Sequence, residues 1–165
     1  GNIMGINTLS LGQFLTIAAA AISVILAGWG SAKGVGLAGQ TSAGVSSENP
    51  EVNSKLMVLQ ILPGTQGIYG FLIAVIILVN TGALGGNMVD VGLLQGLMYV
   101  AAVMPIGVVG LLSAIHQGKV AAAAMMMVGQ HPDMSGKAIT MTVMVETYAV
   151  LALLASFLMV NAIKL

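Results

Sequence analysis

The chain has 165 residues, of which 58% are hydrophobic and only 6% are charged, and its five lysines are balanced by five acidic residues. Soluble domains carry about 25% charged residues, so this composition indicates an integral membrane protein. A net charge of zero and 4% aromatic residues leave neither a basic face nor a stacking surface for nucleic acid, and the lack of cysteine excludes disulfides and thiolate metal sites.

Four apolar segments are long enough to cross a bilayer, which takes about 20 residues in a helix. In chain order they are Phe14–Gly30, Leu56–Val79, Leu93–Ile115 and Ala138–Ile163. We expect the first and third to continue as helix beyond these limits, through sequence rich in alanine and glycine. The predicted fold is an all-α membrane protein with four transmembrane helices.

The positions of the lysines favour one orientation. Lysines flank the first and third connections, whereas the middle connection (80–90) has none. By the positive-inside rule, connections 31–55 and 116–137 are cytoplasmic and both termini lie outside the cell membrane, although Lys164 is an exception at the C-terminus. The lysines that decide this orientation are Lys33, Lys55, Lys119 and Lys137.

The sequence also repeats itself. An offset of 82 residues aligns thirteen identical pairs, among them Gln13/Gln95, Ser31/Ser113, Pro50/Pro132 and Lys55/Lys137. We interpret the chain as two helical hairpins duplicated in parallel, residues 1–82 and residues 83–165. One difference stands out, because Gly64 of the first hairpin corresponds to Glu146 of the second. Only the second hairpin therefore carries a carboxylate in the membrane.

Glu146 is the only charged residue within the four apolar segments. A charge in hydrocarbon costs at least ~2.5 kcal/mol, so this carboxylate has to be protonated, ion-bound or paired. No lysine or arginine lies at its depth. Two interpretations remain: a structural carboxylic acid that bonds a neighbouring helix, or a carboxylate that loads and releases a cation. We favour the cation.

Three polar side chains are predicted at the depth of Glu146. At a rise of ~1.5 Å per residue, Thr65 and Gln66 on the second helix and Gln117 on the third fall at nearly the same level. Their oxygens are neutral donors suited to a hard cation, and a single carboxylate balances a monovalent ion but not a divalent one. Tyr69, one turn further, is placed either to hydrogen-bond Glu146 or to pack between helices.

Two other patterns carry no chemistry in our interpretation. Residues 34–39 fit the GxGxxG string, but that string needs a strand before it and a βαβ unit around it to bind a dinucleotide. Here it continues a membrane helix, so we expect it to permit close helix packing instead. His116 and His131 have no metal-ligand partner nearby in the sequence and are expected at the surface or the membrane interface.

Four sequence motifs resemble a known family. The motif SAKGVG (31–36) follows the first segment, and QGKVAAA (117–123) follows the third. The second segment contains LPGTQGIYGF (62–71) and the fourth contains MVETYA (144–149). In order and spacing they resemble the rotor-ring proteolipids, the K or c-type subunits, of bacterial V-type sodium ATPases. The resemblance extends over nearly the whole chain.

The resemblance implies a subunit that carries Na+ across the membrane while ATP is hydrolysed in a separate cytoplasmic head, so that the chain alone is not an enzyme. It implies Na+ as the bound ion, without an organic cofactor. The implied site consists of Glu146, Thr65, Gln66, Gln117 and the backbone carbonyl of Leu62, with Tyr69 bonded to the glutamate.

The resemblance also implies partners: identical copies in a closed ring, a stator membrane subunit with a cationic residue, a central-stalk subunit on the cytoplasmic loops, and lipid. One alternative is the same rotor subunit with specificity for protons. Another is a small ion-coupled secondary transporter, but such transporters are usually built from inverted repeats, whereas this repeat is parallel.

Overall fold

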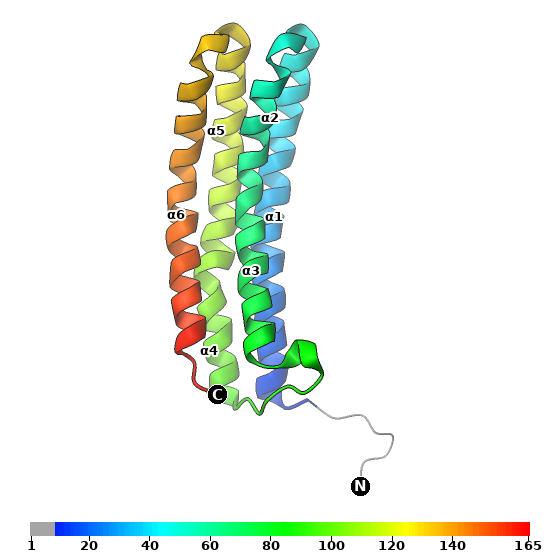
Figure 1. Ribbon diagram of the computed structural model, residues 1–165, viewed down its shortest axis with the longest axis vertical. Coiled ribbons are helices and arrows are strands. Elements are labelled where there is room, and N and C mark those ends of the chain that lie inside the picture. Colours follow the sequence, from blue (N-terminus) through cyan, green and yellow to red (C-terminus); the bar gives the residue numbers. More distant parts are fainter. Residues whose placement is uncertain (1–8) are drawn as a thin grey trace.

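The computed structural model describes residues 9–165, whose regular structure is entirely helical, as predicted. Four long helical segments stand side by side in an elongated bundle, with the C-terminus and the start of the described chain at the same end (Figure 1). Each segment is long and apolar enough to cross a membrane. Residues 1–8 of the predicted first hairpin lie outside the described part.

The four segments are longer than the apolar stretches. The first is α1 (Leu11–Glu48), whose 38 residues span about 57 Å at ~1.5 Å per residue, well beyond the ~30 Å of bilayer hydrocarbon. The expected continuation of the first and third segments as helix is confirmed. The second segment comprises η1 (Pro50–Val52), α2 (Asn53–Ile61), η2 (Leu62–Gly64) and α3 (Thr65–Asn80), and η3 (Ala83–Gly85) follows it in the middle connection. The third segment comprises α4 (Leu93–Met104), the π-helical η4 (Pro105–Val109) and α5 (Gly110–Gln130). The fourth comprises η5 (Pro132–Met134) and α6 (Ser135–Ala162).

The two hairpins begin in the same way. At the start of α1, the side chain of Gln13 accepts a hydrogen bond from the backbone N–H of Ser10 at 2.9 Å. At the start of α4, Gln95 accepts one from the backbone N–H of Gly92 at 2.7 Å. Helix N-termini leave backbone N–H groups without partners, and the repeated glutamine satisfies one of them at the same place in each hairpin.

The tips of the two hairpins also share their geometry. Asn49 ends α1 with φ −136° and ψ 83°, and His131 ends α5 with φ −134° and ψ 81°. Each is followed by a proline at the first position of a short 3-10 helix, where the missing N–H costs no hydrogen bond. The sequence duplication is thus matched in local structure, while the division of the chain at residue 82 stays a prediction.

Glycines allow α1 to pack closely on α5. A Cβ atom added at Gly34 would collide with the carbonyl oxygen of Ala114, and one added at Gly118 would lie 2.5 Å from the Cα of Gly34. Small residues at such crossings are typical of membrane helices, whose backbones can then approach each other. The GxGxxG string lies inside α1, as expected, and its first glycine serves this packing.

Two apolar clusters fill the bundle above and below a polar level. One cluster, nearer the termini, includes Ile73, Tyr99 and Val160, and the other, nearer the hairpin tips, includes Leu56 and Met125. In each of the four segments, buried polar side chains come between the residues of one cluster and those of the other. They are Ser23, Ser31, Gln66, Ser113, Gln117, Thr142 and Ser156.

Candidate ion-binding site

Glu146 lies on α6, is partly exposed, and turns its carboxylate toward α3. Its Oε1 atom is in close contact with the hydroxyl of Thr65 and accepts a hydrogen bond from the hydroxyl of Tyr69 at 2.9 Å. Thr65 and Tyr69 are one turn apart on α3, so they present both hydroxyls on one face of that helix. The carboxylate is therefore held at the seam between the two hairpins.

Oxygen atoms converge on the hydroxyl of Thr65. Its Oγ1 lies 3.1 Å from the carbonyl oxygen of Leu62 and 3.2 Å from Oε1 of Gln66, in addition to its contact with Glu146. A hydroxyl has one hydrogen, so it can donate to only one of these three acceptors at a time. Four oxygens thus share one hydroxyl hydrogen, an arrangement that a cation would stabilise.

The carbonyl of Leu62 reaches this cluster because the helix is distorted there. Pro63 has no N–H to donate to the carbonyl one turn earlier, and the chain forms a 3-10 turn over Leu62–Gly64 between α2 and α3. In that turn the backbone N–H of Thr65 bonds to the Leu62 carbonyl, which brings the same carbonyl to the Thr65 hydroxyl.

The amide of Gln66 is fixed by two donor contacts on its nitrogen. Nε2 donates to Oε1 of Gln117 at 2.7 Å and to Oγ of Ser113 at 3.2 Å, both on α5. Because the nitrogen is committed to α5, the amide oxygen points to Thr65 and the carboxylate. Gln66 is fully buried, so this orientation is not exchanged for contacts with water.

Gln117 joins the network one step away from the carboxylate. Its oxygen accepts from Gln66, and its Nε2 donates to the backbone carbonyl of Thr142 at 3.1 Å. Within residues 9–165, no hydrogen bond links Gln117 to Glu146. The predicted polar level is therefore present with all its members, but Gln117 contacts the carboxylate only through Gln66 and Thr65.

Ser113 is a member of the network that our sequence analysis did not assign. Its Oγ accepts from Gln66 and donates to the backbone carbonyl of Val145 at 3.1 Å, next to Glu146 in the chain. A signal for it was present, because Ser31 and Ser113 are an identical pair of the repeat. Ser31 also accepts across a helix contact, from the backbone N–H of Gly67 at 2.7 Å.

The donor set suits a monovalent hard cation. In the described chain every buried side-chain nitrogen and oxygen has a hydrogen-bond partner, and no cluster of three or more His, Cys, Asp or Glu residues could hold a metal. His116 and His131 are exposed, as expected. One carboxylate with neutral carbonyl, amide and hydroxyl oxygens remains, and this set compensates one positive charge.

Fold and site together define a multi-pass membrane proteolipid that carries a single carboxylate between two duplicated helical hairpins. The family model for the C-subunit of ATP synthase matches the chain twice, over residues 18–77 and 100–159. The starting points differ by 100 − 18 = 82 residues, which equals the offset of the internal repeat. The chain belongs to this ATP synthase C-subunit family, and it is accordingly a membrane ring component rather than a catalytic one.

Two proteins whose names state a function are similar to this chain in sequence. The chain is 43% identical over 149 residues to the V-type sodium ATPase subunit K of Enterococcus hirae, covering 90% of this chain and 92% of that protein. It is 38% identical over 141 residues to the A-type ATP synthase subunit K of Methanocaldococcus jannaschii, covering 85% of this chain and 59% of that protein. Both matches agree with the family resemblance of the four sequence motifs.

Proposed function

We propose that this chain is the ion-carrying subunit of a V-type rotary ATPase ring and that Glu146 binds and releases Na+. The observation that carries the proposal is the oxygen cluster at Thr65, where the carboxylate, a backbone carbonyl and an amide oxygen surround one hydroxyl. A proton needs only the carboxylate, whereas a sodium ion needs several oxygens held together. The Enterococcus hirae relative is a sodium ATPase subunit, which supports the same ion.

The transport step depends on whether the charge of Glu146 is neutralised. With Na+ bound, the carboxylate is neutralised, and its position in the ring can pass through lipid without the cost of an exposed charge. When rotation brings it to a stator membrane subunit with a cationic residue, the opposite charge competes for the carboxylate and releases the ion. ATP hydrolysis in a separate cytoplasmic head drives the rotation.

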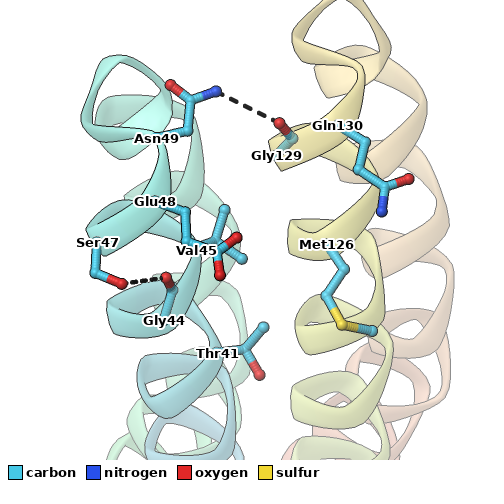
Figure 2. A pocket seen from close by; sticks show the side chains of 9 residues that line it. All are labelled: Thr41, Gly44, Val45, Ser47, Glu48, Asn49, Met126, Gly129 and Gln130. Atoms are coloured by element: carbon cyan, nitrogen blue, oxygen red, sulfur yellow. Dashed lines mark hydrogen bonds between the residues drawn. The ribbon is translucent and has the colours of Figure 1, made fainter.

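We assign the hairpin tips to the cytoplasm from the lysine pattern, and the tips offer a surface for a central-stalk subunit. A cavity of about 470 Å³ opens between the ends of α1 and α5 (Figure 2). Glu48 and Gln130 line it, together with Thr41 and Ser47. Lys55 of one tip donates to the carbonyl of Pro132 in the other at 2.9 Å, which joins the two tips into one platform.

A labelling experiment tests the bound ion. A hydrophobic carbodiimide reacts with a protonated carboxyl group in the membrane, so it should modify Glu146 and no other acid of the chain. Na+ should protect Glu146 at fixed pH and ionic strength, because an ion-bound carboxylate is not protonated. K+ at the same ionic strength serves as the control. Equal labelling with and without Na+ would overturn the sodium assignment and leave proton transport by the same residue.

A further inference from the structure

The hydroxyl of Ser113 on α5 makes two hydrogen bonds of opposite direction. It donates its hydrogen to the backbone carbonyl of Val145 at 3.1 Å, and its oxygen accepts from the side-chain amide of Gln66 at 3.2 Å. A hydroxyl has a single hydrogen, so while that hydrogen is held by Val145, Ser113 can only accept from Gln66. The side chain of Ser113 is buried, which leaves water little access as a competing partner.

Gln117 constrains the same amide in the same way. Its Nε2 donates to the backbone carbonyl of Thr142 at 3.1 Å, which leaves its oxygen to accept from Gln66 at 2.7 Å. An amide nitrogen carries two hydrogens, and the Gln66 nitrogen gives one to Gln117 and one to Ser113. Both acceptors are in turn oriented by backbone carbonyls of α6, which can only accept.

A reversed Gln66 amide would be stabilised by neither neighbour. Turned over, its oxygen would face the oxygen of Gln117, and also that of Ser113 unless Ser113 gave up its bond to Val145. A buried polar group that loses its partner is costly. The same turn would place the NH2 group beside Thr65, where its hydrogens would repel a cation. The orientation of this amide therefore decides whether an oxygen or an N–H faces the carboxylate of Glu146.

We propose that Ser113 is a positioning residue for Na+, which holds the Gln66 amide with its oxygen toward Glu146. This inference rests on the proposed binding of Na+ at Glu146 and adds a residue that controls affinity without being a ligand. The hydrogen bonds that orient the amide lie within the chain, so none of the binding energy of the ion is needed to turn it. Preorganised groups of this kind bind more tightly than groups that have to be ordered by the ligand.

The internal repeat separates this role from that of a serine that only joins helices. Ser31 is the counterpart of Ser113, but it accepts from the backbone N–H of Gly67 at 2.7 Å. At the repeat positions of Gln117 and Gln66 the chain has Val35 and Tyr148. The repeat therefore preserves the serine without the two amides, and only Ser113 lies in a network that ends at a carboxylate.

The variant Ser113→Ala tests the proposal in native membranes. It removes the acceptor of one Gln66 hydrogen, and the Na+ concentration that half-protects Glu146 from carbodiimide should rise roughly three- to tenfold, as expected for one net hydrogen bond. K+ at the same ionic strength is the blank. Ser113→Cys keeps the size of the side chain but offers only a weak acceptor. It should shift the Na+ dependence in the same direction and covers the case in which the alanine variant fails to assemble.

A double variant distinguishes positioning from a general loosening of the bundle. In a Gln66→Ala background, Ser113→Ala should change the Na+ dependence by no more than about twofold, because there is no amide left to orient. Loosened packing would instead weaken Na+ binding by the same factor with or without the amide.

Ser156→Ala is the matched control. Ser156 is another fully buried serine that joins the third and fourth segments, and it accepts from the backbone N–H of Ile106 at 3.1 Å. It lies ten residues beyond Glu146 on α6, about 15 Å along the helix at ~1.5 Å per residue. Its loss should lower thermal stability in detergent but leave the Na+ dependence within about twofold of the parent, because the Gln66 amide keeps both acceptors.

Three outcomes would overturn the proposal. They are unchanged Na+ binding in the alanine and cysteine variants of Ser113, an equal loss of affinity in Ser156→Ala, and a full effect of Ser113→Ala in the absence of the Gln66 amide. The proposed function can fail separately. If Na+ does not protect the parent protein, the sodium assignment falls and this inference with it, whereas protection of the parent with no effect at Ser113 overturns this inference alone.

Discussion

The hydroxyl of Thr65 touches the carboxylate of Glu146, although the two residues lie 81 positions apart on different hairpins of the duplicated chain. Tyr69 makes the second contact across the same seam. Neither hairpin contains the oxygen cluster alone. The affinity for an ion therefore depends on how the hairpins pack as well as on the ligands themselves.

Thr65→Ala removes the hydroxyl at the centre of the cluster. It takes away one of the oxygens that would surround the ion, and the loss of such a buried partner costs about 1–3 kcal/mol. We expect Na+ to bind roughly ten- to a hundredfold more weakly, measured by the Na+ concentration that protects Glu146 from carbodiimide. Labelling in the absence of Na+ should persist, because protonation needs only the carboxylate.

Thr65→Ser is the control for this variant, because it keeps the hydroxyl and removes only a methyl group. Its Na+ dependence should stay within a few-fold of the parent. An equal loss in the serine and alanine variants would mean that the methyl group, through packing at the seam, determines affinity instead of the hydroxyl oxygen.

Gln66 and Gln117 should behave as one unit. Since Gln117 reaches the carboxylate only through Gln66, Gln117→Ala should weaken Na+ binding by releasing the Gln66 amide from its 2.7 Å hydrogen bond. In a Gln66→Ala background the same change should add little, because there is no amide left to orient. Independent, additive losses in the double variant would instead indicate that Gln117 contributes a ligand of its own.

Much of the site could be predicted from depth alone. The membrane confines polar groups to few levels, and a helix rises by a fixed amount per residue, so Thr65, Gln66 and Glu146 could be placed at one height without a structure. The four apolar segments followed from composition in the same way. The helical extensions of the first and third segments run through sequence that is rich in alanine and glycine but contains no proline.

The direction in which each side chain points from its helix axis was harder to predict than its depth in the membrane. Depth places Gln117 beside Glu146, but its side chain turns to Gln66 and to the Thr142 carbonyl. Depth alone does not tell whether a serine in a membrane helix bonds its own backbone or a neighbouring helix, and Ser113 bonds Gln66 of α3 and the Val145 carbonyl of α6. The contact of the Leu62 carbonyl with Thr65 depends on the 3-10 turn at Pro63, and that local geometry is not visible in the residue pattern.

Gly34→Ala should loosen the seam on which the site depends. The new methyl group would collide with the Ala114 carbonyl, a backbone atom that cannot move aside, so α1 and α5 must separate. We expect lower thermal stability in detergent and weaker Na+ protection. Gly44→Ala, in the same helix but with no atom within 4 Å of the added carbon, should be neutral or slightly stabilising because alanine favours helix.

The outcome that would contradict this packing argument is equal stability of the two alanine variants. Loss of stability in both would point to a general need for glycine in α1. Loss in neither would mean that the helices tolerate a wider separation at Gly34 than the surrounding contacts suggest.

Glu146→Gln should abolish Na+ binding while the protein still folds. The amide keeps an oxygen for the Thr65 and Tyr69 hydroxyls but brings no negative charge to balance the ion. Sodium uptake by reconstituted ATPase should be lost, with helicity by circular dichroism unchanged as the folding control.

The double variant Gly64→Glu/Glu146→Gln tests whether the charge alone suffices, because it moves the carboxylate to the equivalent position of the first hairpin. At the repeat positions of Gln66 and Tyr69 the chain has Tyr148 and Leu151, so the repeat supplies neither the amide oxygen of Gln66 nor the hydroxyl of Tyr69. We expect no recovery of Na+ uptake, and full recovery would show that the neighbours of Glu146 do not define the site.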